Sequence, residues 1–302
     1  AITAAGTTLD GNNFDITVNR NWSNAGTYTA GTGTVNFATN TAATITGSTT
    51  FNNFSCVIAA GGKTIQFTAG TTQTITGSFT VTGAAGSANL VRLVSTAAAA
   101  WTIDNVGNSE SVTFAYVQYS NVLSNDITAA TSANAGNNDD TASPRWIFTP
   151  TTLTWTGGGA STSWDDGDNW DNGYPPNTVD DAVINNAGWQ PATLATSTTV
   201  ANLTINVGAS VDTNDLALTV PGTITGVGTL SGTAGGAAEL ITVGGDFTVG
   251  TYTPNGTKVL LDGATTPVSV SANTFYDLEI SKSLGTDTVN ATGDLTLSAG
   301  GT

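Results

Sequence analysis

The chain has 302 residues, enough for one or two domains with a substantial core. Only 9% of the residues are charged, the formal net charge is −16, and there is no histidine. An acidic surface repels phosphate backbones and anionic lipids, so we expect neither nucleic-acid binding nor membrane binding. The lack of histidine excludes Ser-His-Asp and Cys-His catalysis and removes the commonest zinc ligand. No apolar run is long enough to span a bilayer, so no membrane insertion is expected.

Short strand patterns follow one another along the whole chain. Each alternates apolar with polar residues and ends in Gly, Asn or Ser, which is typical of strands bounded by turns. Threonine is the commonest residue, and it suits the exposed face of a strand because it is β-branched and polar. No helical periodicity is sustained. The expected strands include 14–18, 44–46, 64–67, 79–82, 90–94, 112–114, 203–205, 216–220 and 295–297.

A long internal repeat relates the beginning of the chain to its end. Ile16-Thr-Val18 returns 225 positions later as Ile241-Thr-Val243, and Asn21-Trp22 returns as Asp246-Phe247. Such a fixed offset indicates one duplicated structural unit in a stacked architecture. The repeat continues at an offset of 224, where Gly26-Thr-Tyr-Thr29, Thr50-Phe51 and Phe54 match Gly250-Thr-Tyr-Thr253, Thr274-Phe275 and Leu278.

A shorter repeat favours a particular fold class. Ile45-Thr-Gly-Ser recurs 30 residues later as Ile75-Thr-Gly-Ser, and this spacing fits one coil of two or three short strands. We therefore predict an all-β protein, a parallel β-helix or closely related β-solenoid. The alternative is a pair of antiparallel β-sandwiches, whose hairpins should show more Asn-Gly turns than the two found here, at Asn172 and Asn255.

A domain boundary is expected near residue 150. The polar stretch 133–140 is closed by Pro144-Arg-Trp-Ile-Phe148 and Pro150, and a segment rich in Trp and Asp follows. The prediction is thus one solenoid module at 1–149 and a second at 150–302. Most of the negative charge falls in the second module, which holds 15 of the 22 acidic residues and only two basic ones.

The single cysteine is expected to be an inert core residue. Cys56 matches Ile280 in the repeat, an apolar strand position, and one thiol forms no internal disulfide. The alignment predicts that Cys56 and Ile280 are buried at equivalent positions, and that Phe51 and Phe275 are too.

The opening of the second module resembles a known class of proteins. The pattern Trp155-Thr-Gly, Trp164, Asn169-Trp170, a Pro-bearing turn and Asp180-Asp-Ala-Val-Ile184 is similar to the repetitive β-helical regions of large bacterial surface proteins and autotransporter passengers. The first module contains similar motifs. The resemblance implies secretion and display on a bacterial cell surface, and names no particular ligand.

Two features of this opening could bind ligands. Carboxylates are dense enough to supply oxygen ligands for calcium, although no glutamate closes the loop as in a hand-type site; the alternative is an Asx-turn loop that satisfies its own backbone. Aromatic faces could stack on sugar rings, and the alternative is a packed start to the second module. The candidate calcium ligands are Asp165, Asp168, Asp171 and Asp180, and the candidate carbohydrate platform comprises Trp155, Trp164, Trp170, Tyr174 and Trp189.

The sequence therefore predicts a structural extracellular protein rather than an enzyme: a segment of a repetitive surface fibre, surface layer or adhesin. A carbohydrate-binding module at 155–189, with polysaccharide as partner, is the alternative. Ser298-Ala-Gly-Gly-Thr302 reads like Ala4-Ala-Gly-Thr-Thr8. This match predicts that copies or neighbouring repeats stack head-to-tail, because a solenoid cut between coils exposes apolar core and unpaired backbone groups.

Overall fold

The computed structural model describes residues 5–232, 240–264, 267–282 and 287–298. The protein is all-β, and its parallel strands stack as a β-solenoid of about 13 turns. The predicted fold class is confirmed. Every pairing between named strands in the described residues is parallel, so the alternative of two antiparallel sandwiches is wrong. The chain divides into two compact units, Ala1–Thr149 and Pro150–Thr302.

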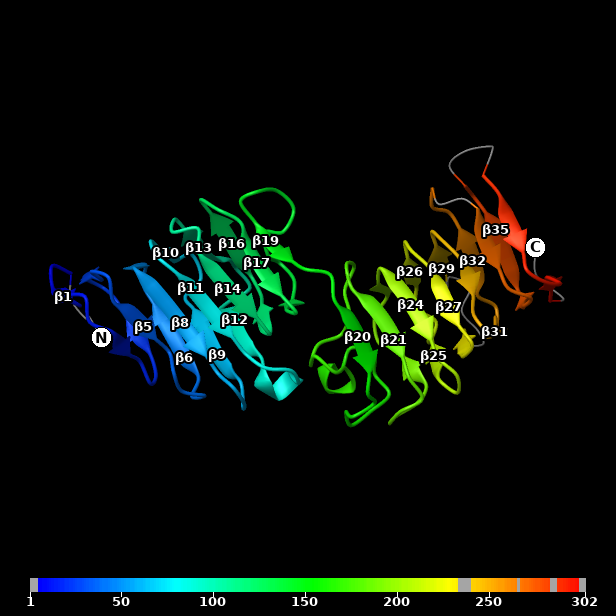
Figure 1. Cartoon of the computed structure of the whole chain (residues 1–302), viewed down its shortest axis with the longest axis horizontal. Coiled ribbons are helices and arrows are strands. Elements are labelled where there is room, and N and C mark those ends of the chain that lie inside the picture. The colour runs from blue at the N-terminus through cyan, green and yellow to red at the C-terminus, as the bar shows by residue number, and fades with distance from the viewer. Residues whose placement is uncertain (1–4, 233–239, 265–266, 283–286, 299–302) are drawn as a thin grey trace. The chain divides into compact units, whose positions relative to one another are not determined.

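In unit 1, each coil contributes one strand to each of three sheet faces (Figure 1). The first face holds β2 (Ile16–Thr17), β5 (Thr34–Asn36), β8 (Asn53–Val57), β11 (Phe79–Thr82), β14 (Glu110–Thr113), β17 (Ile127–Ala130) and β19 (Trp146–Phe148). The second holds β3 (Trp22–Ser23), β6 (Ala43–Thr46), β9 (Lys63–Phe67), β12 (Val91–Ser95), β15 (Ala115–Val117) and β18 (Ala133–Asn134). The third holds the pair β1 (Thr8–Asp10) and β4 (Thr27–Thr29), then β7 (Thr49–Phe51), β10 (Thr72–Ile75), β13 (Trp101–Asn105) and β16 (Ser120–Leu123). A 3₁₀ turn, η1 (Ser87–Asn89), precedes β12.

Unit 2 has the same plan. Its first face holds β20 (Thr152–Trp155), β21 (Asp181–Ile184), β24 (Asn202–Ile205), β27 (Ile224–Gly226), β30 (Phe247–Thr248), β33 (Val268–Val270) and β36 (Val289–Ala291). The second holds β22 (Ala192–Thr193), β25 (Ser210–Asp212), β28 (Thr229–Ser231) and β31 (Thr251–Thr253), followed by the pair β34 (Thr274–Phe275) and β37 (Thr296–Leu297). The third holds β23 (Thr198–Thr199), β26 (Leu218–Val220), β29 (Leu240–Val243), β32 (Lys258–Leu261) and β35 (Asp277–Ile280). The 3₁₀ turn η2 (Gly167–Asn169) lies between β20 and β21.

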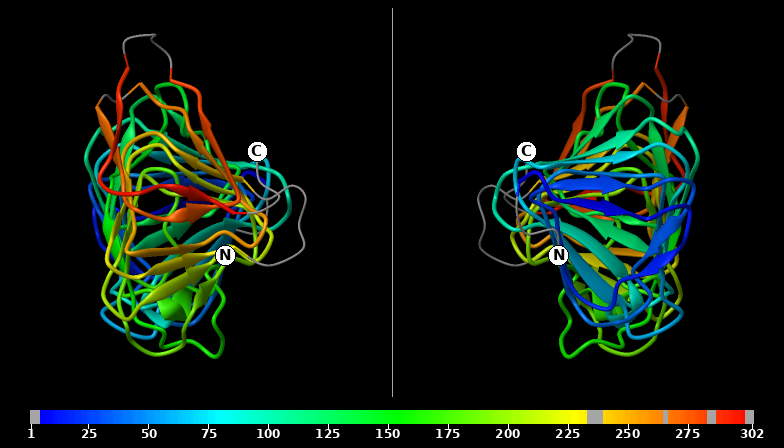
Figure 2. Two further views of the ribbon diagram at one scale, coloured as in Figure 1. Left: turned by 90° about the vertical axis from the view of Figure 1, so that its right-hand side faces the viewer. Right: turned by 90° about the vertical axis from the view of Figure 1, so that its left-hand side faces the viewer.

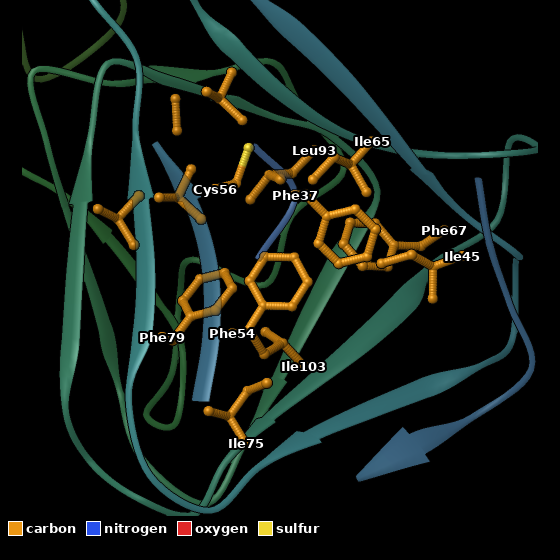
Figure 3. Close-up of a cluster of buried hydrophobic side chains, with 14 of the residues drawn as sticks. Phe37, Ile45, Phe54, Cys56, Ile65, Phe67, Ile75, Phe79, Leu93 and Ile103 are labelled. Carbon is orange, nitrogen blue, oxygen red and sulfur yellow. The ribbon is translucent and has the colours of Figure 1, made fainter. Parts of the chain in front are cut away.

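Apart from the coils around residues 130–180, each strand lies beside the strand three further along, so three strands make one coil. All of these neighbours are hydrogen-bonded pairs except β4 with β7 and β31 with β34. Seen end-on, the chain of each unit winds around an interior of its own (Figure 2). Side chains alternate along a strand, and the apolar ones point inward. In unit 1 this interior is filled by stacked aliphatic and aromatic residues, ten of which are labelled in Figure 3: Phe37, Ile45, Phe54, Cys56, Ile65, Phe67, Ile75, Phe79, Leu93 and Ile103.

Asparagine and aspartate side chains tie the corners of neighbouring coils together. The Oδ1 atom of Asn53 accepts the backbone N–H of Ser78 at 2.9 Å, one coil later. In unit 2, Asn202 Oδ1 accepts the N–H of Thr223 at the same distance. Each bond satisfies a backbone donor where the chain turns and the sheet ladder is interrupted. The high asparagine content therefore serves the fold.

The internal repeat is structural and spans ten consecutive strands. β1–β10 of unit 1 correspond one by one to β28–β37 of unit 2, with the same pairings and the same order of faces. The agreement extends to corner bonds: Asn21 Oδ1 accepts Thr44 N–H at 2.9 Å, and Asp246 Oδ1 accepts Ser269 N–H at 2.7 Å.

An aromatic triad is repeated as well. In unit 1, the ring of Trp22 meets Tyr28 edge-on at 5.0 Å and Phe51 at 5.5 Å. In unit 2, the ring of Phe247 meets Tyr252 edge-on at 5.4 Å and Phe275 at 5.7 Å. Phe51 and Phe275 are both fully buried, so that prediction is confirmed.

The predicted burial of Ile280 is wrong. Cys56 and Ile280 do occupy equivalent strand positions, but Cys56 is 0% exposed whereas Ile280 is 53% exposed. Cys56 is covered because β11 pairs with β8 and places Val81 beside it. Among the described residues, no strand pairs with the far edge of β35. Burial at this position thus depends on the next coil.

Substitution of Cys56 tests the packing of unit 1. Burial raises the pKa of the Cys56 thiol to about 12, so little thiolate forms at neutral pH. We expect native thiol labelling to be slow. Cys56→Ser should lower the free energy of unfolding by about 1–3 kcal/mol because it buries a hydroxyl with no designed partner. Cys56→Ala, which removes volume without adding a polar group, should cost less; equal losses measured by urea unfolding would contradict this account.

Candidate functional site

The segment 155–189, here called the tryptophan segment, replaces most of a coil at the start of unit 2. Within it, residues 156–180 form an excursion that leaves β20 after Trp155 and returns to β21, so these consecutive strands pair directly, with Trp155 opposite Ile184. An antiparallel bridge joins Trp155 to Trp170. The predicted calcium ligands and most of the predicted sugar platform lie on this excursion.

The aromatic residues of the tryptophan segment form a buried cluster. Trp155, Trp164 and Trp170 are at most 2% exposed, and the ring of Trp170 meets the other two edge-on at 5.3 and 4.8 Å. Trp170 Nε1 also donates to the carbonyl of Trp164 at 2.8 Å, and Tyr174 is 2% exposed. The predicted carbohydrate platform is wrong for these four residues, because no ring face is open to a sugar. They form the packed start of unit 2, the alternative interpretation.

Trp189 is the exception, with 53% of its side chain exposed. Its backbone is fixed, since its carbonyl accepts Trp155 Nε1–H at 2.9 Å and its N–H donates to Gly157 at 3.2 Å. Gly157 and Gly188 cross here with positive φ, and a Cβ atom on either would lie within 2.4 Å of the other strand's backbone. This close crossing leaves no room for a side chain at position 157, which explains the glycine in Trp155-Thr-Gly157.

The residue that organises the tryptophan segment is Asn169, which sequence analysis did not single out as a site residue. It is 0% exposed. Its Nδ2 donates to the carbonyls of Ser161 at 3.0 Å and Ser163 at 2.8 Å, and its Oδ1 accepts the N–H of Gly159 at 2.8 Å. One amide therefore satisfies three backbone groups that have left the sheet ladder.

The predicted calcium ligands do not converge. Asp165 Oδ2 accepts the hydroxyl of Thr196 at 2.9 Å, whereas Asp171 Oδ1 accepts the N–H of Thr154 at 3.1 Å. Asp168 lies in the turn η2, whose N-cap side chain is Asp166. Within the described ranges, no three carboxylates, cysteines or histidines are grouped so that they could hold a metal ion. Calcium at this set stays a prediction without a prepared site: the Asp171 and Asp180 carboxylates bond backbone N–H groups, and the Asp165 carboxylate bonds a hydroxyl of the next coil.

Asp180, the fourth predicted ligand, is 2% exposed and ties two turns together. Its Oδ1 accepts the N–H of Thr151 at 3.0 Å and its Oδ2 accepts the N–H of Asn177 at 3.2 Å. Loss of hydration on burial outweighs these two bonds and raises the pKa of Asp180 from 3.8 to about 6. A carboxyl group that is reluctant to ionise is here a structural clamp at the start of unit 2.

Basic residues gather at a shallow depression of about 350 Å³ in unit 1, and they are already engaged. Lys63 is 3% exposed and its Nζ donates to the carbonyls of Thr39 at 2.6 Å and Thr41 at 2.7 Å. The Arg92 guanidinium lies over the ring of Tyr116 at 4.5 Å. These cations hold neighbouring turns, so the depression offers no prepared anion site.

The termini of the two units expose apolar strand positions. At the start of unit 1, Leu9 in β1 is 40% exposed; at the end of unit 2, Ile280 and Leu297 are 53% and 55% exposed. The expected match between Ser298–Thr302 and Ala4–Thr8 lies mostly outside the described residues. The described strands show a different equivalence, in which Leu297 takes the place of Ile75.

The role of Asn169 is testable by a substitution that keeps its shape. Asn169→Asp replaces the two amide donors with a carboxylate oxygen facing two carbonyls. We expect the free energy of unfolding of unit 2 to fall by about 3 kcal/mol or more. The measurement is urea unfolding monitored by tryptophan fluorescence. Asn172→Asp, a half-buried position in the same segment, is the matched control and should cost much less. Similar losses for the two variants would show that Asn169 has no special role.

Asp180 should make stability pH-dependent in a defined direction. Because its folded pKa of about 6 lies above 3.8, the folded protein keeps a proton between these pH values that the unfolded chain has lost. Its contribution to stability is therefore fully present below pH 4 and is lost as the pH rises through 6, by about 2–3 kcal/mol.

The Asp180→Asn variant lacks this titration, so its stability relative to the parent protein should rise between pH 4 and 7. The measurement is urea unfolding at several pH values, with the exposed Asp215→Asn variant as control. A difference between Asp180→Asn and parent that stays constant with pH would contradict the assignment.

Comparisons with protein-family models, with curated proteins and with solved structures found no match. Both helical elements among the described residues are single 3₁₀ turns, neither of which could cross a membrane. The resemblance to repetitive bacterial surface proteins thus rests on sequence motifs, and the geometry itself has to support a function.

Proposed function

We propose that this chain is a structural protein, a stretch of a repetitive fibre, surface layer or adhesin on the bacterial cell surface, in which β-solenoid coils stack end to end. The observation that carries the proposal is the ten-strand repeat, β1–β10 and β28–β37, with its conserved pairings. A protein built by repeating the same coils gains length and cohesion with each repeat.

The side-chain arrangement fits a scaffold better than a catalyst or a sugar-binding module. Several of the charged residues hold the fold: Asp180 and Lys63 bond backbone groups where the chain turns, and Lys258 pairs with Glu279 on the neighbouring strand. The alternative, a carbohydrate platform, loses four of its five rings to the interior, which leaves Trp189 exposed. Outward threonines and asparagines add uncharged polar groups to an acidic surface, and such a surface keeps an extracellular protein soluble.

Native material from the producing cells tests the proposal. Electron microscopy with antibodies raised against the chain should label elongated structures on intact cells, and surface proteolysis of those cells should remove the signal. The purified chain should associate linearly as its concentration rises, measured by light scattering. Labelling confined to the cell interior, together with a purified chain that stays monomeric, would overturn the proposal.

A further inference from the structure

The two end faces of this chain are interior faces elsewhere in the same chain. β35, β36 and β37, at the end of unit 2, correspond to β8, β9 and β10 of unit 1. In unit 1 these three strands are covered by β11, β12 and β13 with a continuous parallel register. In unit 2 the described residues contain no strand beyond them.

The inward positions show what is missing. Cys56 and Ile75 are both 0% exposed beneath the next coil, whereas the matching Ile280 and Leu297 are 53% and 55% exposed. On the β35 strand the side-chain volume is similar to that on β8, because Leu278 replaces the larger Phe54 while Ile280 replaces the smaller Cys56.

The opposite end behaves in the same way. Leu9 in β1 is 40% exposed, and its counterpart Leu230 in β28 is 0% exposed because β25 pairs on its far side through Val211. The starting end of unit 1, formed by β1, β2 and β3, corresponds to β28, β29 and β30 in unit 2. There the same edges are covered by β25, β26 and β27.

We propose that the exposed end of unit 2 binds one specific occupant: a coil with the sequence character of β11–β13, residues 79–105, supplied by the next stretch of the same repeat. The inference rests on the proposed function and specifies its register. The repeating unit is then about 220 residues long, the distance from Ile75 to the equivalent Leu297, and it contains one tryptophan segment. It is shorter than the repeat of 302 residues that would result from joining whole chains end to end.

The junction is fixed by a hydrogen bond present in both units. Thr76 N–H donates to the carbonyl of Phe51 at 3.0 Å, and Ser298 N–H donates to the carbonyl of Phe275 at 2.7 Å. Ser298 therefore takes the place of Thr76, and residue 77 is the next position of the repeat. One position fits less well: Ala291 stands where Phe67 stacks on Trp101, so an added coil keeps only part of that contact.

The test extends the full chain and reads the cover directly. Residues 1–298 are followed by a second copy of residues 77–149, and Ile280→Cys is introduced in a Cys56→Ala background in both the parent and the extended chain. We expect the thiol at position 280 to react with a thiol reagent rapidly in the parent and at least tenfold more slowly in the extended chain. Val207→Cys, which lies at a position 74% exposed, should react equally fast in both.

Two further chains make the result decisive. In the first, Phe79→Asp and Val81→Asp in the appended copy should restore fast labelling at position 280. In the second, residues 9–149 follow Thr302, the join that the match between the termini predicts, and this chain should leave the thiol exposed. Three results would each overturn the inference: fast labelling in the chain extended by unaltered residues 77–149, equal protection in its aspartate variant, or protection only in the chain extended by residues 9–149.

Because labelling reports on one covalent chain, its outcome is independent of whether the native protein forms filaments. A protected thiol without surface fibres would leave the register intact and contradict the proposed function. Surface fibres together with an unprotected thiol would support the proposed function and contradict the register.

Discussion

Parallel pairing between each strand and the strand one coil later is the constraint on which the whole structure depends. It places equivalent side chains above one another, so the interior of each unit is a set of stacked apolar columns such as Phe37, Phe54 and Phe79. A column has no natural end, and every coil needs a neighbour on both sides. The burial of a residue is therefore a property of the next coil as much as of its own strand, and Cys56 and Ile280 show the two outcomes.

The second requirement is to satisfy backbone groups wherever the chain leaves a sheet. Asparagine and aspartate do this at ordinary corners, as Asn21 and Asp246 do in the two copies of the repeat. Asn169 does it for three backbone groups of the excursion between β20 and β21. The composition of the chain, rich in Asn and poor in charge, thus follows from an architecture with many corners and few charged contacts.

The sequence predicted those features that recur along it. Alternating strands, a coil-sized spacing and the offset near 224 led to the solenoid and to Phe51 and Phe275 in the core. Features that depend on the path of one loop escaped prediction. Dense carboxylates are compatible with a cation site or with Asx turns, and only the fold decides that Asp165 and Asp171 lie on different partners. Likewise the sequence of Trp164 and Trp189 does not distinguish a buried ring from an exposed one, because both follow polar turns.

The stacking geometry also determines how the molecule carries load. Hydrogen bonds between coils run along the solenoid axis, and a coil such as the one from Leu203 to Ile224 contains 21 residues. Folded, it adds about 5 Å to the length of its unit, the spacing between paired strands. Pulled out, the same residues span about 70 Å. Tension applied along the axis would therefore act on the hydrogen bonds between coils, and each coil that separates would lengthen the chain by the difference between these two spans.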